Sequence, residues 1–206
     1  MVYILPFEDS DLDSTIRCIS YTFVQETISQ SLEIDAENYR EFAKLYCQII
    51  LGNKLSLVVR NEEFGDVIGF SILTDFVTEI PDFTCLDPRL IVIINFTREL
   101  DDWYKSKYKV KSGEILHLSM TGVYEQYRGR GIAQKLMEET FNVAKTNNYK
   151  SIIAECTGEI TQHIRAKYGF KIVKEIVYKT YLYNGELVFK DIQKPPSCKL
   201  MIKTID

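Results

Sequence analysis

The arrangement of apolar and polar residues divides the chain into short strands and amphipathic helices. Apolar runs bounded by turn residues predict strands, and apolar positions at helical spacing predict helices. The predicted strands are Val2–Leu5, Leu55–Asn61, Val67–Leu73, Ile115–Val123, Ser151–Cys156, Phe170–Tyr178, Tyr181–Phe189 and Lys199–Ile205. The predicted helices run from the N-cap oxygens of Asp9–Asp11 to about Ser29, and over Ala36–Leu51, Gly131–Thr146 and Glu159–Lys167.

Two turns indicate how some of these strands pair. Asn61–Asp66 connects two consecutive apolar strands and predicts a hairpin. Asn184–Gly185 is a strong signal for a tight turn, because both residues tolerate positive φ. It predicts that Phe170–Tyr178 and Tyr181–Phe189 form a second hairpin.

The segment from Asp75 to Ser112 interrupts this regular order. Pro81 and Pro88 break its pattern, and a polar helix is expected over Asn95–Lys107. The segment is rich in aromatic residues, namely Phe76, Phe83, Phe96, Trp103, Tyr104 and Tyr108. Long insertions in compact domains are often functional. We interpret residues 76–112 as a lid over a binding site; the alternative is that the aromatic side chains only anchor the insertion.

The order of elements predicts a mixed α/β (α+β) fold with strands pairing in both senses. With 206 residues the chain is long enough for one well-packed domain, so we expect a single domain over residues 1–206. The net charge is −4, and no long Lys/Arg block occurs, which argues against a nucleic-acid partner. The sequence has neither a signal peptide nor an apolar run of 18 residues, so we expect no membrane association.

The five cysteines are scattered and form no C-x-x-C pair. Buried free thiols in a reducing compartment fit this pattern, and we expect a cytoplasmic monomer. With only two histidines, His117 and His163, a metal site is not expected. On a strand, His117 is interpreted as a hydrogen-bonded structural residue, with catalysis as the alternative. Cys156 is interpreted as a buried thiol and not as a nucleophile.

The most informative motif is Gln126–Tyr–Arg–Gly–Arg–Gly–Ile–Ala133, between the fourth predicted strand and a helix. A glycine-rich turn that opens a helix presents unpaired backbone N–H groups and the positive end of the helix dipole to one point. Such a turn binds a pyrophosphate. The dinucleotide fingerprint is not satisfied, since Gln134 stands where the third Gly belongs, and the Lys–Ser/Thr pair of a P-loop is missing.

This motif, its place in the element order and the sequence Tyr168–Gly169–Phe170 resemble the GNAT superfamily of acetyl-CoA-dependent N-acetyltransferases. Three further features resemble the animal arylalkylamine (dopamine-type) N-acetyltransferases: the sequence FVQETI at 23–28, the long insertion before ILHLSMTGV, and the tail EIVYKTYLYNGELVF. The resemblance implies a central twisted mixed sheet of about seven strands with helices on both faces. It also implies an N-acetyltransferase that uses acetyl-CoA and acts on a small-molecule amine.

The resemblance implies which residues bind the cofactor. Backbone groups of Thr121, Gly122 and Val123 are expected to hold the acetyl group and the pantetheine arm, with an N–H near Val123 stabilising an oxyanion. The pyrophosphate is expected on the loop residues Arg128, Gly129, Arg130, Gly131, Ile132 and Ala133. For the two arginine side chains, a solvated position is an equal alternative.

The resemblance also implies catalytic residues. Glu26 aligns with the general base of the insect enzymes, and such a group is needed because only about one alkylamine molecule in a thousand is neutral at pH 7. Thr157 and Thr161 stand where the group has a Ser pair that assists proton transfer; the alternative is an N-cap at Thr157 and a packed Thr161. Arg165 occupies the position of the Tyr that many GNAT enzymes use as general acid.

Other functions remain open at this stage. The acceptor could instead be a polyamine, an amino acid or a protein N-terminus. The chain could also be an acyl-CoA-binding module with weak catalysis, because the Thr pair and the missing Tyr depart from the family pattern. An aromatic insertion favours an arylalkylamine, whereas an acidic groove favours a polyamine or a peptide.

Overall fold

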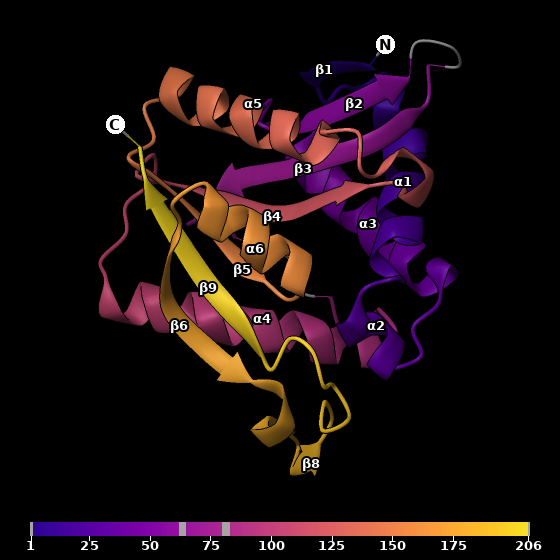
Figure 1. Ribbon diagram of the computed structural model, residues 1–206, viewed down its shortest axis with the longest axis vertical. Coiled ribbons are helices and arrows are strands. Elements are labelled where there is room, and N and C mark those ends of the chain that lie inside the picture. Colours follow the sequence, from indigo (N-terminus) through magenta and orange to yellow (C-terminus); the bar gives the residue numbers. More distant parts are fainter. Residues whose placement is uncertain (1, 62–64, 80–82, 206) are drawn as a thin grey trace.

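The computed structural model describes residues 2–61, 65–79 and 83–205 and shows a mixed sheet with helices on both faces (Figure 1). The helices are α1 (Leu12–Phe23), α2 (Thr27–Ser31), α3 (Ala36–Ile50), α4 (Pro88–Lys107), α5 (Ile132–Thr146) and α6 (Glu159–Lys167), with 3₁₀ turns η1 (Asp9–Asp11), η2 (Glu125–Tyr127) and η3 (Tyr178–Thr180). The strands are β1 (Val2–Pro6), β2 (Leu57–Asn61), β3 (Val67–Asp75), β4 (Ile115–Val123), β5 (Ser151–Cys156), β6 (Lys171–Val177), β7 (Leu182–Tyr183), β8 (Glu186–Leu187) and β9 (Ser197–Thr204). Among the described residues, no helix has the length and apolar composition needed to cross a bilayer.

Seven strands form the main sheet in the order β1-β2-β3-β4-β5-β9-β6. Only β4 and β5 pair in parallel, whereas the other neighbouring strands of this sheet are antiparallel. The prediction of a mixed α/β fold with about seven strands is therefore confirmed. The predicted hairpin of the second and third strands is also present as β2 and β3, although residues 62–64 of its turn lie outside the described residues.

Strands β4 and β5 are paired over only part of their length. Their parallel register runs from Ile115 to His117 on β4 and is not continued beyond Ile153 on β5. Ile72 and Leu73 are consecutive in β3, but their partners in β4, Met120 and Leu118, are two positions apart. Strand β4 therefore has one extra residue next to this point. A bulge of this kind bends a strand and increases its twist. The bulge therefore accounts for the separation of β4 from β5.

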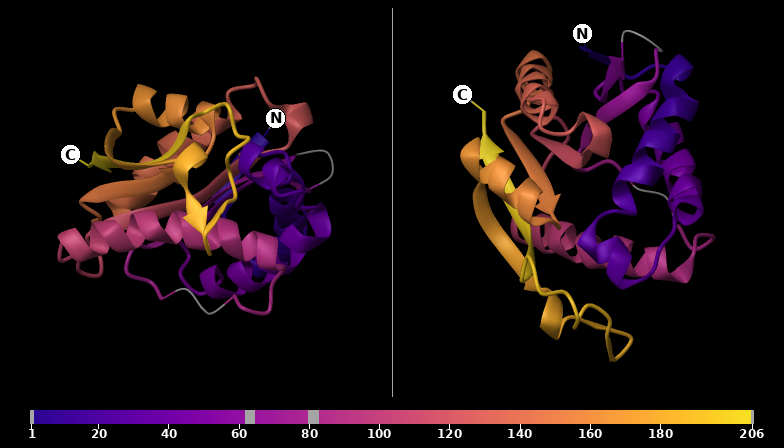
Figure 2. Two further views of the ribbon diagram at one scale, coloured as in Figure 1. Left: turned by 90° about the horizontal axis from the view of Figure 1, so that it is seen from below. Right: turned by 45° about the vertical axis from the view of Figure 1, so that its right-hand side comes forward.

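The two faces of the sheet carry separate apolar cores, and Figure 2 shows α1 and α3 on one side and α5 and α6 on the other. Side chains of a strand alternate between faces. Accordingly Ile72 belongs to the core under α1, α3 and α4, while the next residue, Leu73, belongs to the core under α5. The cores on both faces explain why β3 is buried along its length up to Thr74.

The N-terminal helix is broken, in contrast to the single helix predicted up to about Ser29. Helix α1 ends at Phe23, and α2 begins at Thr27 after Glu26, whose backbone is extended with φ −69° and ψ 139°. Phe23 and Val24 before the break and Ile28 after it all pack on the same core, so the hydrophobic period continues through the break. Periodicity alone therefore did not reveal the break, which turns Glu26 away from the helix direction.

Helix α4 is longer than predicted, because it begins at Pro88 and not near Asn95. The Asp87 side chain accepts a 2.8 Å hydrogen bond from the Arg89 backbone N–H and caps the helix. Pro88 occupies the first turn, where the missing N–H has no cost. Phe96 stacks against Tyr178 from the C-terminal segment, so the insertion is anchored in the core.

The predicted pairing of the C-terminal strands was wrong. Strand β6 pairs with β9 and not with the segment Tyr181–Phe189. Asn184 and Gly185 do form a tight turn with positive φ, but it closes only the small two-stranded sheet of β7 and β8. Strand β9 inserts between β5 and β6, and such a long-range pairing leaves no local signal in the sequence.

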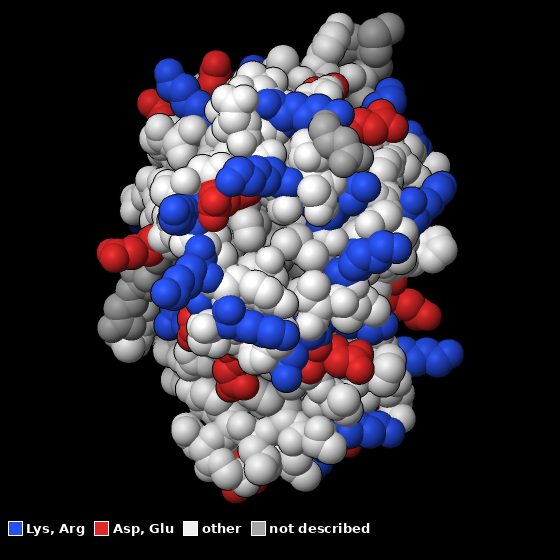
Figure 3. Space-filling view, turned by 90° about the vertical axis from the view of Figure 1, so that its left-hand side faces the viewer, with Lys and Arg blue, Asp and Glu red and all other residues white. Residues whose placement is uncertain are grey.

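Strand β6 forms one edge of the sheet, opposite to the β1 edge, and carries Lys171 and Lys174. Figure 3 shows Lys and Arg side chains scattered over this side of the molecule, with Asp and Glu side chains between them. Charged side chains on an edge strand disfavour pairing with another chain. This edge is therefore protected against further strand addition.

The close packing of Gly122 provides a test of the β4 geometry. A Cβ atom at Gly122 would lie 2.6 Å from Phe70 Cζ and 2.6 Å from Thr22 Cγ2. We expect Gly122→Ala to lower the free energy of unfolding by about 1–3 kcal/mol, measured by urea denaturation. Gly52→Ala is the control, because nothing lies within 4 Å of its Cβ position. Equal stability of the two variants would contradict the packing.

Candidate active site

A cavity of about 350 Å³ lies where β4 and β5 separate. Its lining includes Leu118–Thr121 of β4, and Ala154–Cys156 of β5 with Thr157 after it, which follow the residues that pair the two strands. The other walls come from the α1–α2 junction, α3, α4 and α6. Five aromatic residues line it, namely Phe23, Tyr39, Phe42, Tyr46 and Phe83. The cavity thus combines an apolar wall with the edges of β4 and β5 that no longer pair with each other.

Glu26 lies on the wall of this cavity, at the break between α1 and α2. Its Oε2 lies 2.9 Å from the position that a Cβ atom on Gly158 would occupy, so the absence of a side chain there leaves room for the carboxylate. Burial raises the pKa of Glu26 above its usual 4.5, and the positive charge of Arg128 opposes this shift. A carboxylate that holds a proton at higher pH is suited to exchange protons near neutrality.

Thr157 and Thr161 line the same cavity as Glu26. The Thr161 hydroxyl donates a 2.8 Å hydrogen bond to the Gly158 carbonyl, and the Thr157 carbonyl accepts a 2.7 Å hydrogen bond from the Tyr178 hydroxyl. The N-cap of α6 is Gly158, so the alternative of an N-cap at Thr157 was wrong. The structure therefore brings all three predicted catalytic residues to one cavity.

The glycine-rich loop forms the N-terminus of α5, outside the lining of the cavity. Gly129 and Gly131 both have a φ of +76°, and Gly131 is the N-cap of the helix. The N–H groups of Gly129, Arg130 and Gly131 donate to no other described residue. These groups and the first N–H groups of α5, including Ile132 and Ala133, are available for an anion, as in other helix N-termini.

The arginine side chains of this loop are turned back onto the protein. Arg128 Nε donates a 3.2 Å hydrogen bond to the Val123 carbonyl, and Arg130 Nη2 donates a 3.1 Å bond to the Gln126 carbonyl. The Arg130 guanidinium also lies over the Tyr127 ring, 5.3 Å from its centroid. Both arginines thus shape the loop in addition to supplying positive charge.

A buried arginine that the sequence did not assign to binding is part of the cavity wall. Arg165 is 5% exposed, and its Nη2 donates a 3.0 Å hydrogen bond to the Thr121 hydroxyl. Its Nε has no hydrogen-bond partner among the described residues, and burial lowers its pKa. A buried cation without a carboxylate partner favours an anion in its surroundings. Arg165 can therefore stabilise negative charge that develops beside Thr121.

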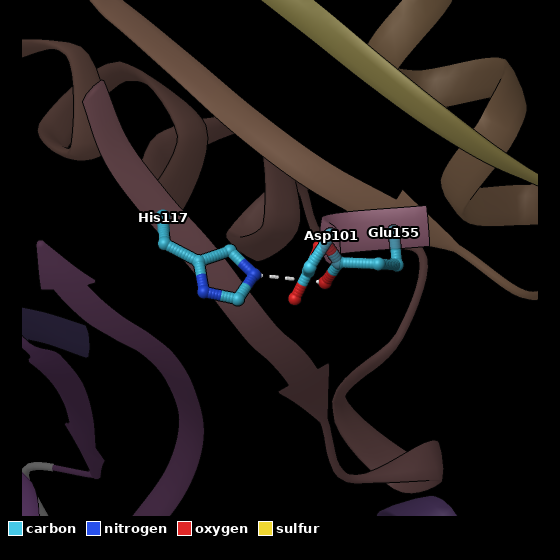
Figure 4. Close-up of side chains that lie close together, drawn as sticks. All are labelled: Asp101, His117 and Glu155. Carbon is cyan, nitrogen blue, oxygen red and sulfur yellow. Dashed lines mark hydrogen bonds and ion pairs between the residues drawn. The ribbon is translucent and has the colours of Figure 1, made fainter. Parts of the chain in front are cut away.

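Three ionisable side chains meet on the wall formed by α4, β4 and β5 (Figure 4). His117 Nε2 lies 2.8 Å from Glu155 Oε2, and Asp101 approaches the same pair, so that one ligand atom from each residue lies within 4.8 Å of the others. His117 is thus hydrogen-bonded, as predicted. Asp101 and Glu155 were not singled out from the sequence; the only signal for Glu155 was a charged residue within a strand that is otherwise apolar on this face.

Cys156 is buried and also lines the cavity. Burial raises the pKa of its thiol to about 12, so the thiol stays protonated near neutrality. All five cysteines are free, and four of them are buried. A buried neutral thiol is a poor nucleophile, which agrees with the interpretation of Cys156 as a packing residue.

A family model described as GCN5-related N-acetyl-transferase matches residues 98–158, which include Asp101, Thr121, the glycine-rich loop and Thr157. Solved structures share the fold along the whole chain. The C-terminal condensation domain of Ebony, in complex with β-alanyl-dopamine, is 18% identical, with a TM-score of 0.91 and coverage of 100% of this chain and 99% of that one.

Two insect enzymes have the same fold. Arylalkylamine N-acetyltransferase 2 from Aedes aegypti is 20% identical, with a TM-score of 0.79 and coverage of 100% and 99%. A polyamine N-acetyltransferase from Drosophila melanogaster is 14% identical, with a TM-score of 0.71 and coverage of 99% and 100%. The family model thus matches residues 98–158 of this chain, and the solved structures show that the whole chain has the fold of these proteins.

Proposed function

We propose that the protein transfers an acetyl group from acetyl-CoA to the primary amine of a small arylalkylamine, with Glu26 as general base. The observation that carries this proposal is the position of Glu26, whose carboxylate lines an aromatic-walled cavity at the point where β4 and β5 separate. Direct attack by the deprotonated amine needs a base at this place. The acceptor class draws further support from the fold shared with arylalkylamine N-acetyltransferases of mosquitoes.

The residues of the glycine-rich loop fit the diphosphate of acetyl-CoA. Two glycines with positive φ and N–H groups without protein partners form an anion site at the start of α5. Thr121, Gly122 and Val123 lead from this loop along the strand to the cavity and are proposed to hold the pantetheine arm and the acyl group. Acetyl-CoA supplies the activated acyl group when it is bound.

Glu26 has two proposed roles. Its negative charge attracts the ammonium form of the substrate, and its raised pKa allows it to accept the proton that the amine must lose. The surrounding aromatic side chains exclude water, which strengthens both effects because the local dielectric is low. Thr157 and Thr161 lie in the same wall and are proposed to orient this proton transfer.

Arg165 is proposed to replace the tyrosine that other members of the superfamily use as general acid. A guanidinium does not give up its proton near neutrality, so it cannot protonate a leaving thiolate. Its charge and its unpartnered Nε can stabilise that thiolate electrostatically. A thiolate is a good leaving group, with a conjugate-acid pKa of about 8.5, so stabilisation without protonation is sufficient.

A second candidate function is favoured by the acidic part of the cavity wall. Asp101 and Glu155 line the cavity together with the aromatic residues. Agmatine and polyamine N-acetyltransferases share this fold, and so does the Ebony domain bound to β-alanyl-dopamine. A substrate with two amino groups is therefore the alternative to a simple arylalkylamine. The free buried thiols support a proposed cytoplasmic location.

Binding of coenzyme A is tested at Gly131, whose φ of +76° strains any residue with a side chain. We expect Gly131→Ala to weaken coenzyme A binding by about tenfold, because relaxation of the strain redirects the loop N–H groups. The measurement is isothermal titration calorimetry. Gly113→Ala is the matched control, since Gly113 has a φ of +79° and lies at the other end of β4. Equal affinities for the two variants would contradict the assignment of the loop.

The role of Glu26 is tested by Glu26→Gln. We expect kcat/KM to fall by about 100-fold or more at neutral pH, because the variant cannot accept the proton. Since the pKa of Glu26 is raised, kcat/KM of the unchanged protein should fall as the pH drops through that raised value, and the variant should lack this fall. Glu159→Gln is the control, because Glu159 is exposed next to Gly158. A variant profile identical to that of the unchanged protein removes Glu26 from the mechanism.

The acceptor is identified with a panel of amines and acetyl-CoA, with release of free thiol as the readout. We expect turnover of tyramine, dopamine, serotonin and tryptamine, because the cavity has an aromatic wall and one carboxylate at its α1–α2 side. Strong turnover of spermidine without turnover of any arylalkylamine would exclude the arylalkylamine proposal and favour the second candidate.

A further inference from the structure

The cavity contains a second acidic position besides Glu26. Asp101 from α4 and Glu155 from β5 meet His117 from β4, with one ligand atom of each residue within 4.8 Å of the others (Figure 4). Glu26 is not a member of this group and lies instead beside Gly158, at the start of α6. The two acidic positions are therefore built by different elements and face the same cavity.

The two carboxylates of this group lack a donor for one oxygen each. Asp101 is 7% exposed, and the Glu155 side chain is also 7% exposed. Asp101 Oδ1 and Glu155 Oε1 have no hydrogen-bond donor among the described residues. Burial and the charge of Glu155 raise the pKa of Asp101, and the two carboxyl groups can form a hydrogen bond with each other only when one of them is protonated. Such a pair is costly to bury unless a cation completes it.

The charge of Lys105 lowers the pKa of both carboxyl groups but does not reach them as an ion pair. Lys105 is on the same helix one turn further, but its Nζ lies over the Phe76 ring, 4.6 Å from the centroid. It forms no ion pair within 4.0 Å with either carboxylate in the part of the chain that the structure describes. Burial lowers the pKa of His117, which therefore stays neutral near pH 7, and its Nε2 is hydrogen-bonded to Glu155.

The shape and chemistry of the group fit an alkylammonium ion. An ammonium has three N–H donors and needs several acceptor oxygens at short distance. The ionised carboxylates supply two through Asp101 Oδ1 and Glu155 Oε1, and Tyr46 and Ser119, whose hydroxyl groups are hydrogen-bonded to each other, also line the cavity. The aromatic ring of Tyr46 and the other aromatic residues provide apolar surface for the carbon chain that carries the ammonium.

We propose that Asp101, Glu155 and His117 form a binding subsite for a second ammonium group of a substrate, distinct from the reacting amine at Glu26. This inference rests on the proposed acyl transfer and narrows the substrate class. The second ammonium can be carried by the acceptor, as in a diamine, or by the acyl group, as in an aminoacyl thioester. The two cases share the same recognition chemistry and differ only in which substrate brings the cation.

Matched substrate pairs that differ in one ammonium group distinguish the two sources. The acceptor pair is 1,4-diaminobutane and pentylamine, used with acetyl-CoA. The donor pair is 3-aminopropanoyl-CoA and butanoyl-CoA, used with tyramine. We expect kcat/KM for the charged member of one pair to exceed that for its uncharged partner by about tenfold to 100-fold, the effect of a charge-assisted hydrogen bond. The pair that shows the preference identifies the carrier of the second ammonium.

Variants of the subsite test whether the preference for the charged substrate depends on Asp101 and Glu155. Asp101→Asn and Glu155→Gln keep the shape of each side chain and remove its charge, so we expect the preference to fall to about threefold or less. The preference is a ratio within one variant, and a merely structural defect would lower both members of a pair equally. Glu99→Gln is the matched control on the same helix; because Glu99 is exposed and does not line the cavity, the ratio should stay unchanged.

Binding of the same four ligands, measured by calorimetry, tests the subsite independently of the proposed acyl transfer. Absence of turnover with preferential binding of the charged ligand would refute the acyl transfer and keep the subsite. No preference in either pair, or the same preference in the Asp101→Asn and Glu155→Gln variants, would overturn the subsite. A stoichiometric metal ion in the purified protein that is lost in Asp101→Asn would also overturn it, because the group would then be a metal site.

Discussion

The separation of β4 from β5 beyond His117 is the constraint on which the site depends. A continuous sheet would satisfy its backbone groups internally and leave no room for a substrate. The extra residue of β4 opposite Ile72 and Leu73 bends this strand away from β5, while the short parallel pairing holds the other end together. The opening thus has a fixed position, and the break between α1 and α2 brings Glu26 to its edge.

Ionisable groups in this cavity are buried at a cost to stability. Glu26, the Asp101–Glu155 pair and Arg165 all have pKa values shifted toward their neutral forms by burial. Packing alone would favour apolar residues at these positions. A charged substrate can stabilise buried ionisable groups that lack an opposite charge in the free protein. The same burial that lowers the stability of the fold therefore allows these groups to bind a charged substrate.

Two groups of ionisable and polar side chains lie at opposite sides of the cavity. On one side, Glu26 and the Thr pair surround Gly158, close to the start of α6. On the other side, Asp101 of α4 reaches the sheet at Glu155. Helix α4 comes from the long insertion, which is anchored through Phe96 and at the same time forms part of the cavity wall. The insertion therefore contributes both to the core and to the wall of the cavity.

The sequence by itself determined the features that depend on neighbouring residues. The glycine-rich turn, the strand before it and the helix after it were predictable, because positive φ and helix N-termini need particular local residues. The order of the elements and the mixed sheet also followed from periodicity. Tertiary structure alone decided the insertion of β9 between β5 and β6, the break before α2, and the meeting of Asp101 with Glu155. These features arise from pairing and burial between distant segments, for which local patterns carry no signal.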